Sequence, residues 1–213
     1  MKEPDAKTPP AKRTRLLPED RHRAILEVAA RVICEHGYDG ASIQEIADAC
    51  ELTKAGLYHY IGSKENLLAE IMAYGMDLFE AQVLAQVKDI ADPVERLRRT
   101  MERNVKLVTR GSSKHITIIL HEHATLKGDA RKTIDRRKKK YVRFLEQAFA
   151  EAVTKGLIRP VSPKVAAFSF LGMVLWTYKW FRPDGELSDD QIAEAMIDLL
   201  FGGLAPAREG SKR

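Results

Sequence analysis

Apolar residues in this chain recur every three or four positions, and no useful length of it alternates with a period of two. The first spacing is that of an amphipathic α-helix, and the second is that of a half-buried strand. The pattern therefore predicts an all-α protein without internal repeats. Capping residues, glycines and prolines divide it into expected helices at about Pro18–His36, Ile43–Cys50, Lys54–Tyr60, Lys64–Lys88, Asp92–Arg110, Lys114–Leu126, Gly128–Lys155, Ser162–Arg182 and Ser188–Gly202.

Two short helices in residues 42–63 organise the N-terminal part. Ser42 followed by Glu45 is a capping box, and Thr53 provides a second helix cap. Neither helix is long enough to bury the apolar surface that would make it stable alone. We expect both to pack crosswise on the helix that begins at Pro18, which has an apolar stripe of its own.

The second short helix has a polar outer face that combines a cation, hydroxyls and an aromatic donor. A helix held at a steep angle to its partner and carrying such a face fits the major groove of DNA. Its donors can also reach phosphates. The residues on this face are Thr53, Lys54, Ala55, Tyr58 and His59.

Several strings in this region resemble the N-terminal signature of TetR-type transcriptional repressors. They are SIQEIA at residues 42–47, LTKAGLYHY at 52–60 and SKENLL at 63–68, preceded by ILEVAA at 25–30 and HGY at 36–38. The resemblance implies a helix-turn-helix DNA-binding domain over residues 18–63 and a helical ligand-binding and dimerisation domain over residues 64–205. It also implies a homodimer that reads a palindromic operator and is released by a small-molecule effector.

The family's motif positions also imply individual DNA contacts. We expect three residues to face bases or the adjacent phosphates, namely Thr53, Lys54 and Ala55. On the DNA backbone we expect Tyr58, His59, Lys64 and Ser42.

The ends of the chain and the cysteines suggest a cytoplasmic protein. Residues 1–17 are charged and proline-rich and lack an apolar secretory signal, so we expect a disordered basic arm, and residues 206–213 form a polar, frayed tail. The arm's Lys12, Arg13 and Arg15 either reach a minor groove or are simply solvated. Cys34 and Cys50 have no metal or redox spacing, which favours buried thiols in a reducing compartment.

Charge is distributed unevenly along this chain of 213 residues, which has a net charge of +5. Residues 1–62 hold nine Lys and Arg against ten Asp and Glu, so DNA affinity must come from a few placed donors rather than a general positive field. Residues 127–143 hold nine basic residues against two aspartates, and residues 95–110 have a net charge of +4. These runs are either solvated helix faces or the mouth of a pocket that takes a large anion such as a phosphate.

An acyl-coenzyme A thioester would suit the second interpretation, with its phosphates outside and its acyl chain inside. Residues 176–188 also resemble a string in TetR-type repressors of fatty-acid and steroid breakdown, whose inducers are coenzyme A thioesters. No contact residue follows from that resemblance. Because of their positive charge, we expect Arg103, Arg136 and Arg137 at the mouth of this pocket. Because of their helical spacing, we expect the cavity to be lined by Phe170, Met173, Trp176 and Trp180.

Val165–Tyr178 is apolar nearly all round but too short to span a membrane, which takes about 20 apolar residues. The last two helices either form a four-helix dimer interface or pack within one chain. His121 and His123 would lie about 200° apart on a helix and could share a metal ion only if the helix were broken, so we expect polar helix residues rather than a metal site.

No catalytic motif or cofactor-binding motif occurs, so we do not expect an enzyme. The main rival is a helical small-molecule or lipid-binding module whose helix-turn-helix is only a folding unit, and a helical enzyme comes third. Exposed Lys54, Tyr58 and His59 would argue against that rival, because a scaffold does not need them.

Overall fold

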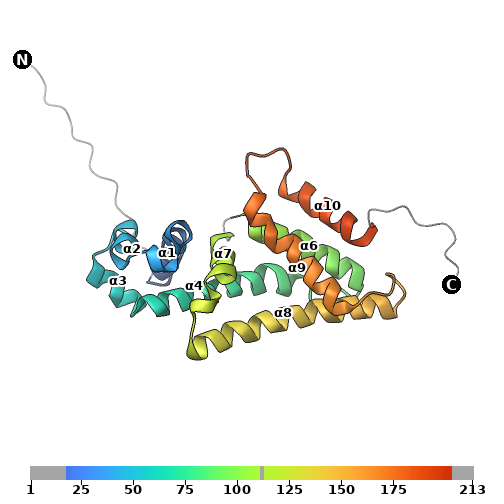
Figure 1. Ribbon diagram of the computed structural model, residues 1–213, viewed down its shortest axis with the longest axis horizontal. Helices are drawn as coiled ribbons and strands as arrows, with labels where there is room; N and C mark the ends of the chain where they lie inside the picture. Colours follow the sequence, from blue (N-terminus) through green and yellow to red (C-terminus); the bar gives the residue numbers. More distant parts are fainter. Residues whose placement is uncertain (1–17, 111–112, 203–213) are drawn as a thin grey trace, which may run out of the picture.

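The computed structural model describes residues 18–110 and 113–202, and helices are the only regular elements within these ranges. The all-α prediction is therefore confirmed there. The expected arm at residues 1–17 and tail at residues 206–213 lie outside the described residues. Three helices gather at one end of the molecule, and α4 runs from them into a larger helical bundle (Figure 1).

The N-terminal unit consists of α1 (Pro18–Gly40), α2 (Ile43–Ala49) and α3 (Lys54–Ile61). Gly37 interrupts the helical backbone of α1 with a φ of 73°, as expected from its place at the end of the apolar pattern. The predicted capping box is confirmed, because Glu45 N lies 3.1 Å from Ser42 Oγ and Ser42 N lies 2.7 Å from Glu45 Oε2. Thr53 Oγ1 accepts from Gly56 N at 3.0 Å and so caps α3.

The helix expected at Lys64–Lys88 is confirmed as far as Val87, but it contains a π turn that the sequence did not predict. It consists of α4 (Lys64–Phe79), the π-helical segment η1 (Glu80–Leu84) and α5 (Ala85–Val87). The buried side chains Phe79, Val83 and Val87 follow one another every four residues. Residues four positions apart lie on one face of an ordinary α-helix as well, so this spacing gives no sign of the π turn.

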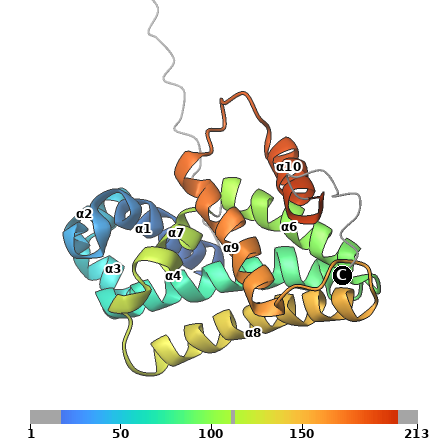
Figure 2. The same cartoon turned by 45° about the vertical axis from the view of Figure 1, so that its right-hand side comes forward.

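The C-terminal bundle is built around α6, which packs against α8, α9 and α10. Helix α4 packs on α7 and α8, and α7 also packs on α1, so α7 links the two ends of the molecule (Figure 2). The elements are α6 (Pro93–Thr109), α7 (Ser113–His121), the 3₁₀ turn η2 (His123–Thr125), α8 (Gly128–Thr154), α9 (Pro163–Trp180) and α10 (Asp189–Gly202).

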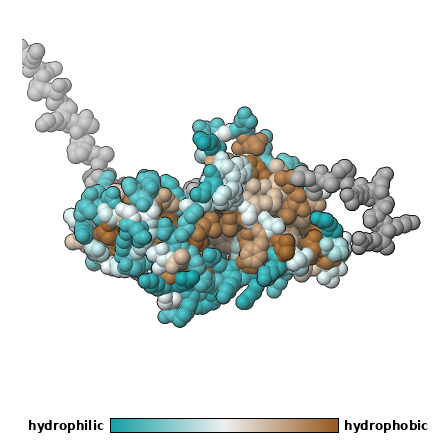
Figure 3. Space-filling view, viewed as in Figure 1, coloured by the Kyte–Doolittle hydropathy of each residue, from teal (hydrophilic) through white to brown (hydrophobic). Residues whose placement is uncertain are grey.

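Helix α9 is apolar on its outer side as well as on its inner side. Ala167, Phe170 and Val174 are buried against the bundle, whereas Phe168 and Trp176 are exposed. Apolar residues accordingly gather on the surface of the C-terminal part, and the N-terminal part is mostly polar (Figure 3). Among the described residues, α9 and every other helix fall short of the length and apolar character that crossing a membrane requires.

Candidate DNA-binding face and ligand cavity

The polar face predicted for α3 points to solvent. Thr53, Lys54, Ala55 and His59 are exposed, and the ring of Tyr58 is 39% exposed. On the opposite side of the same helix, Leu57 and Ile61 are completely buried against the rest of the N-terminal unit. Burying these two residues fixes the rotation of α3 about its axis, so the polar face is held outward.

The other predicted DNA contacts lie at helix starts. The Ser42 and Thr53 hydroxyl oxygens accept the capping bonds of α2 and α3. The Glu45 carboxylate accepts from the Ser42 backbone N–H and also bonds to the Ser42 hydroxyl, and both bonds lower the pKa of that carboxyl, whereas the Thr53 O–H is left to donate outward. Lys64 begins α4 and its Nζ lies 4.5 Å from the centre of the Tyr38 ring, a cation–π contact that holds the ammonium group in place. Ser63 caps the start of α4, and the positive end of this helix dipole adds positive potential beside these donors.

A second candidate site is a cavity of about 110 Å³ inside the C-terminal bundle. Its lining is almost entirely apolar and comes from α4, α6, α7, α8 and α9. The lining residues are Met76, Phe79, Asn104, Leu107, Val108, Ile116, Ile119, Leu120, Lys138, Tyr141, Val142, Leu171 and Leu175.

One hydrogen-bonded pair supplies the polar atoms deep in this cavity. The amide nitrogen of Asn104 donates to the Thr100 carbonyl and to the Tyr141 hydroxyl oxygen, each at 2.7 Å. Burial raises the pKa of Tyr141, so its hydroxyl stays protonated near neutral pH. The hydroxyl oxygen already accepts from Asn104, which leaves its own hydrogen available for a ligand oxygen.

Lys138 is the charged member of the cavity lining among the described residues. It lies one helical turn before Tyr141 on α8, so the two side chains share a face. Burial lowers the pKa of Lys138, and the nearby Asp135 carboxylate opposes that shift. A half-buried ammonium group at the edge of an apolar cavity favours a ligand that brings a negative or hydrogen-bond-accepting group to this edge.

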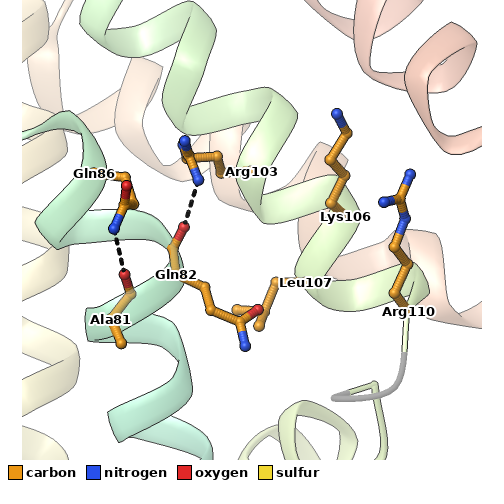
Figure 4. A pocket seen from close by; sticks show the side chains of 7 residues that line it. All are labelled: Ala81, Gln82, Gln86, Arg103, Lys106, Leu107 and Arg110. Atoms are coloured by element: carbon orange, nitrogen blue, oxygen red, sulfur yellow. Dashed lines mark hydrogen bonds between the residues drawn. The ribbon is translucent and has the colours of Figure 1, made fainter.

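A separate hollow of about 510 Å³ has helix α6 on one side and the segments η1 and α5 on the other (Figure 4). It is lined by Ala81, Gln82, Gln86, Arg103, Lys106, Leu107 and Arg110. The Arg103 guanidinium donates to the Gln82 carbonyl at 3.2 Å, which draws it against the π-helical segment. Leu107 lines this hollow and the apolar cavity alike.

The three arginines predicted for the ligand lie in different surroundings. Arg103 lines the hollow, and Arg136 is exposed on α8. Arg137 is instead engaged within the fold, because it pairs with Asp77 at 2.6 Å and with Glu80 at 3.0 Å. Its positive charge therefore joins α8 to α4 and η1 rather than forming an open mouth.

The predicted cavity residues of α9 lie outside the cavity lining. Phe170 is buried in the core and Met173 is half-buried, while Trp176 and Trp180 are 62% and 47% exposed. Helix α9 instead contributes Leu171 and Leu175 to the cavity. A helix that is apolar all round gives no sign in its sequence of which side faces inward.

Sequence reasoning missed the polar pair Asn104 and Tyr141, and it missed Lys138. One signal was present, since Asn104 falls between Met101 and Val108 on the apolar stripe of its helix. A polar residue at an otherwise apolar position either finds a partner or meets a ligand. Its partner lies 37 positions later in the chain, and only the fold brings the two together.

The histidines near the end of α7 have separate partners. His121 Nε2 is hydrogen-bonded to the Tyr178 hydroxyl, and His123 pairs with Asp135 at 2.9 Å. Across the described ranges, no three His, Cys, Asp or Glu side chains are grouped so that they could hold a metal ion.

Two protein-family models match the chain. Residues 25–71 match the model described as bacterial regulatory proteins, tetR family, and residues 91–204 match the tetracyclin repressor-like C-terminal domain. Among relatives, the HTH-type transcriptional repressor KstR2 of Mycobacterium tuberculosis is 24% identical over 186 residues, which cover 86% of this chain and 92% of KstR2.

Solved structures give a stronger likeness. The structure of AibR in complex with isovaleryl coenzyme A and operator DNA is 67% identical, with a TM-score of 0.81 over 85% of this chain and 98% of AibR. The TetR family transcriptional regulator PfmR from Thermus thermophilus is 32% identical, with a TM-score of 0.79 over 85% of this chain and 99% of PfmR. KstR2 and PfmR are thus transcriptional regulators, and AibR binds operator DNA.

Proposed function

Because the chain belongs to the TetR family of bacterial transcriptional regulators, we propose that it is a cytoplasmic repressor controlled by a short-chain acyl-coenzyme A thioester. It binds a palindromic operator as a homodimer, and the thioester lowers its affinity for that operator. The observation that carries the proposal is the 67% identity to AibR, whose structure contains isovaleryl coenzyme A and operator DNA together.

The apolar cavity supports a short acyl group as the buried part of the effector. Its volume of about 110 Å³ lies below the range of about 300–1,000 Å³ that is usual for sites holding a whole small organic ligand. It therefore suits a short branched acyl group as the buried part of the effector, whereas a long fatty acyl chain would require the core to open. We expect the Tyr141 hydroxyl to donate to the thioester carbonyl and the Lys138 ammonium group to attract a neighbouring polar group of the effector.

Two copies of α3 would supply the contacts with the operator. In a dimer they would lie about 34 Å apart, one turn of the duplex, and would read two half-sites. Thr53, Lys54 and Ala55 would face bases or adjacent phosphates. On the DNA backbone we place Ser42, Tyr58, His59 and Lys64.

The effector would act through a finite coupling rather than by covering the DNA-binding face. AibR holds its thioester and its operator in one complex, so in that protein the two ligands are not mutually exclusive. An effector lowers operator affinity only by as much as it prefers the conformation that binds DNA less well. We therefore expect a graded loss of affinity as the thioester is added.

The effector is tested by measuring operator binding against three ligands. Isovaleryl coenzyme A should lower operator affinity at micromolar concentrations, while isovalerate and palmitoyl coenzyme A should have little effect at the same concentrations. Fluorescence anisotropy of a labelled operator gives the affinities, and native mass spectrometry gives the stoichiometry of bound thioester. Equal responses to isovaleryl and palmitoyl coenzyme A would contradict the cavity-size argument, and no response to any thioester would refute the proposed effector.

Operator contact by α3 is tested with Tyr58. Tyr58→Ala should weaken operator binding by about 1–3 kcal/mol while leaving thioester binding intact, because the ring is exposed and its removal opens no cavity. Tyr58→Phe separates the contribution of the hydroxyl from that of the ring. Gln147→Ala, on the exposed side of α8, is the control and should bind the operator normally. Unchanged operator affinity in both Tyr58 variants would remove this contact.

A further inference from the structure

We propose that the hollow between η1, α5 and α6 is a phosphate-binding subsite, and that it takes the nucleotide end of the effector. This inference rests on the proposed function, because it places the charged part of the same thioester. The hollow's volume of about 510 Å³ lies within the range of about 300–1,000 Å³ that is usual for sites of small organic ligands.

The lining of the hollow has the composition of an anion site. It contains the cations Arg103, Lys106 and Arg110, the amides of Gln82 and Gln86, and, among the described residues, no carboxylate. An arginine can bind a phosphate through two parallel N–H donors, and side-chain amides can donate to the remaining oxygens. The cations lie on α6 and the amides on η1 and α5, and in Figure 4 Arg103 lies beside Gln82 while Lys106 and Arg110 extend from α6 farther along the hollow.

Arg103 is the cation most available to a ligand. Within the described residues it pairs with no carboxylate, and its contact is the Gln82 carbonyl. By contrast, Arg110 pairs with Asp189 of α10, and that guanidinium lowers the pKa of the Asp189 carboxyl. Lys106 pairs with the exposed Asp190 at 2.6 Å, and a solvent-accessible pair of this kind is weak enough for a phosphate to displace.

The position of the hollow relative to the apolar cavity fits one amphipathic ligand. Arg103 and Asn104 are adjacent on α6, with Arg103 facing the hollow and Asn104 facing the cavity. Leu107 is the wall common to both spaces. A thioester with its acyl group beside Asn104 would bring its polar arm past Leu107 toward Arg103, and rotation of the Leu107 side chain would connect the two spaces.

The experiment compares ligands that contain different parts of the thioester. Isothermal titration calorimetry is performed on the full chain with isovaleryl coenzyme A, isovaleryl pantetheine and adenosine 3′,5′-diphosphate. The variants are Arg103→Gln, Arg103→Lys and Arg159→Gln. Arg159 is the matched comparison, because it is an exposed arginine between α8 and α9 and lies outside both basic runs of the sequence.

In Arg103→Gln, binding of isovaleryl coenzyme A should weaken by about tenfold or more, and binding of isovaleryl pantetheine should not change. Arg103→Lys should retain part of the affinity, since it keeps the charge but loses the two-donor geometry. Arg159→Gln should bind all three ligands like the wild type. Equal losses for the two thioesters in Arg103→Gln, or a loss confined to Arg159→Gln, would overturn the subsite.

Binding of adenosine 3′,5′-diphosphate tests the phosphate subsite independently of the proposed function. If this diphosphate binds the wild type and its binding is weakened by Arg103→Gln, the hollow is a phosphate site even when no thioester changes operator binding. If the thioester controls operator binding but Arg103→Gln responds like the wild type, the subsite fails and the proposed function stands.

Discussion

His115 is a buried imidazole whose two ring nitrogens find no hydrogen-bond partner within the described residues. It lies where α7 meets α4, with its ring edge-on to Tyr74 at a centroid distance of 5.2 Å. Gly75 permits this close approach, because a Cβ there would lie 3.0 Å from the Cβ of His115. Burial lowers the pKa of His115 to about 4, so the folded protein holds the ring neutral.

This imidazole should make the protein sensitive to acid. Below pH 6.5 the unfolded chain takes up a proton at His115, and the folded chain does not until about pH 4. The free energy of unfolding should therefore fall as the pH drops from about 6.5 to about 4, by up to about 1.4 kcal/mol per pH unit, and show no further loss from this group below that. His115→Phe should remove this contribution, amounting to about 2 kcal/mol at pH 5.

Urea unfolding at pH 7 and pH 5 measures the effect. The difference between the two pH values should be smaller in His115→Phe than in the wild type, whatever the absolute stability of the variant. His36→Gln, an exposed histidine on α1, should retain the wild-type difference. The interpretation is wrong if His115→Phe loses as much stability as the wild type between the two pH values.

At the scale of elements, α9 and α10 both expose apolar side chains. Phe168, Trp176 and Trp180 are exposed on α9 and Leu199 is exposed on α10, whereas Ile192 and Met196 of α10 are buried against the chain's own bundle. An exposed apolar surface of this kind favours a protein–protein contact. The same surface on a second copy would complete a twofold interface of four helices.

Trp176→Glu should separate the dimer. It places a carboxylate where two apolar faces would meet, and Trp176 is 62% exposed, so the chain itself should still fold. Sedimentation analysis should show a monomer at micromolar concentration, and operator affinity should fall by about 100-fold or more because the second half-site is no longer bound by a linked subunit. Gln147→Glu, on α8, should remain dimeric. A Trp176→Glu dimer with normal operator affinity would place the interface elsewhere.

The sequence predicted local features well because local residues determine them. Ser42 and Thr53 are caps within three residues of the groups they bind, and the buried and exposed sides of α3 follow from helical spacing. The π-helical segment, the inward face of α9 and the pairing of Asn104 with Tyr141 could not be predicted. Each depends on packing against helices that are distant in sequence, and the sequence pattern alone contains no information about that packing.

At the scale of the whole molecule, α7 connects the ligand cavity with the DNA-binding unit. Three of its residues line the cavity, and the same helix packs against α1. Just beyond its end, Glu122 accepts a hydrogen bond from Tyr38 N at 3.3 Å. Near its start, the Cys34 thiol donates to the Lys114 carbonyl at 3.4 Å, and burial raises the pKa of that thiol to about 11, which keeps it protonated. A ligand that shifts α7 therefore acts on α1 through contacts at both ends of one helix.

Glu122→Ala should weaken the communication between the two sites. The variant loses the acceptor for Tyr38 N but no part of the cavity lining or of the polar face of α3. Operator affinity without ligand and thioester affinity without DNA should each change by less than about twofold. The factor by which saturating thioester lowers operator affinity should fall several-fold, since couplings of this kind are about 1–3 kcal/mol in total and are distributed over several contacts.

Fluorescence anisotropy with a labelled operator, with and without saturating isovaleryl coenzyme A, gives this factor directly. Glu186→Ala removes an exposed carboxylate from the loop between α9 and α10, far from Tyr38 in sequence, and should show the wild-type factor. A wild-type factor in Glu122→Ala would mean that α4, which packs on α1 and lines the cavity through Met76 and Phe79, carries the coupling without α7. Because α4 begins at the DNA-binding face, a Glu122 variant with normal coupling would make that helix the main connection between the two sites.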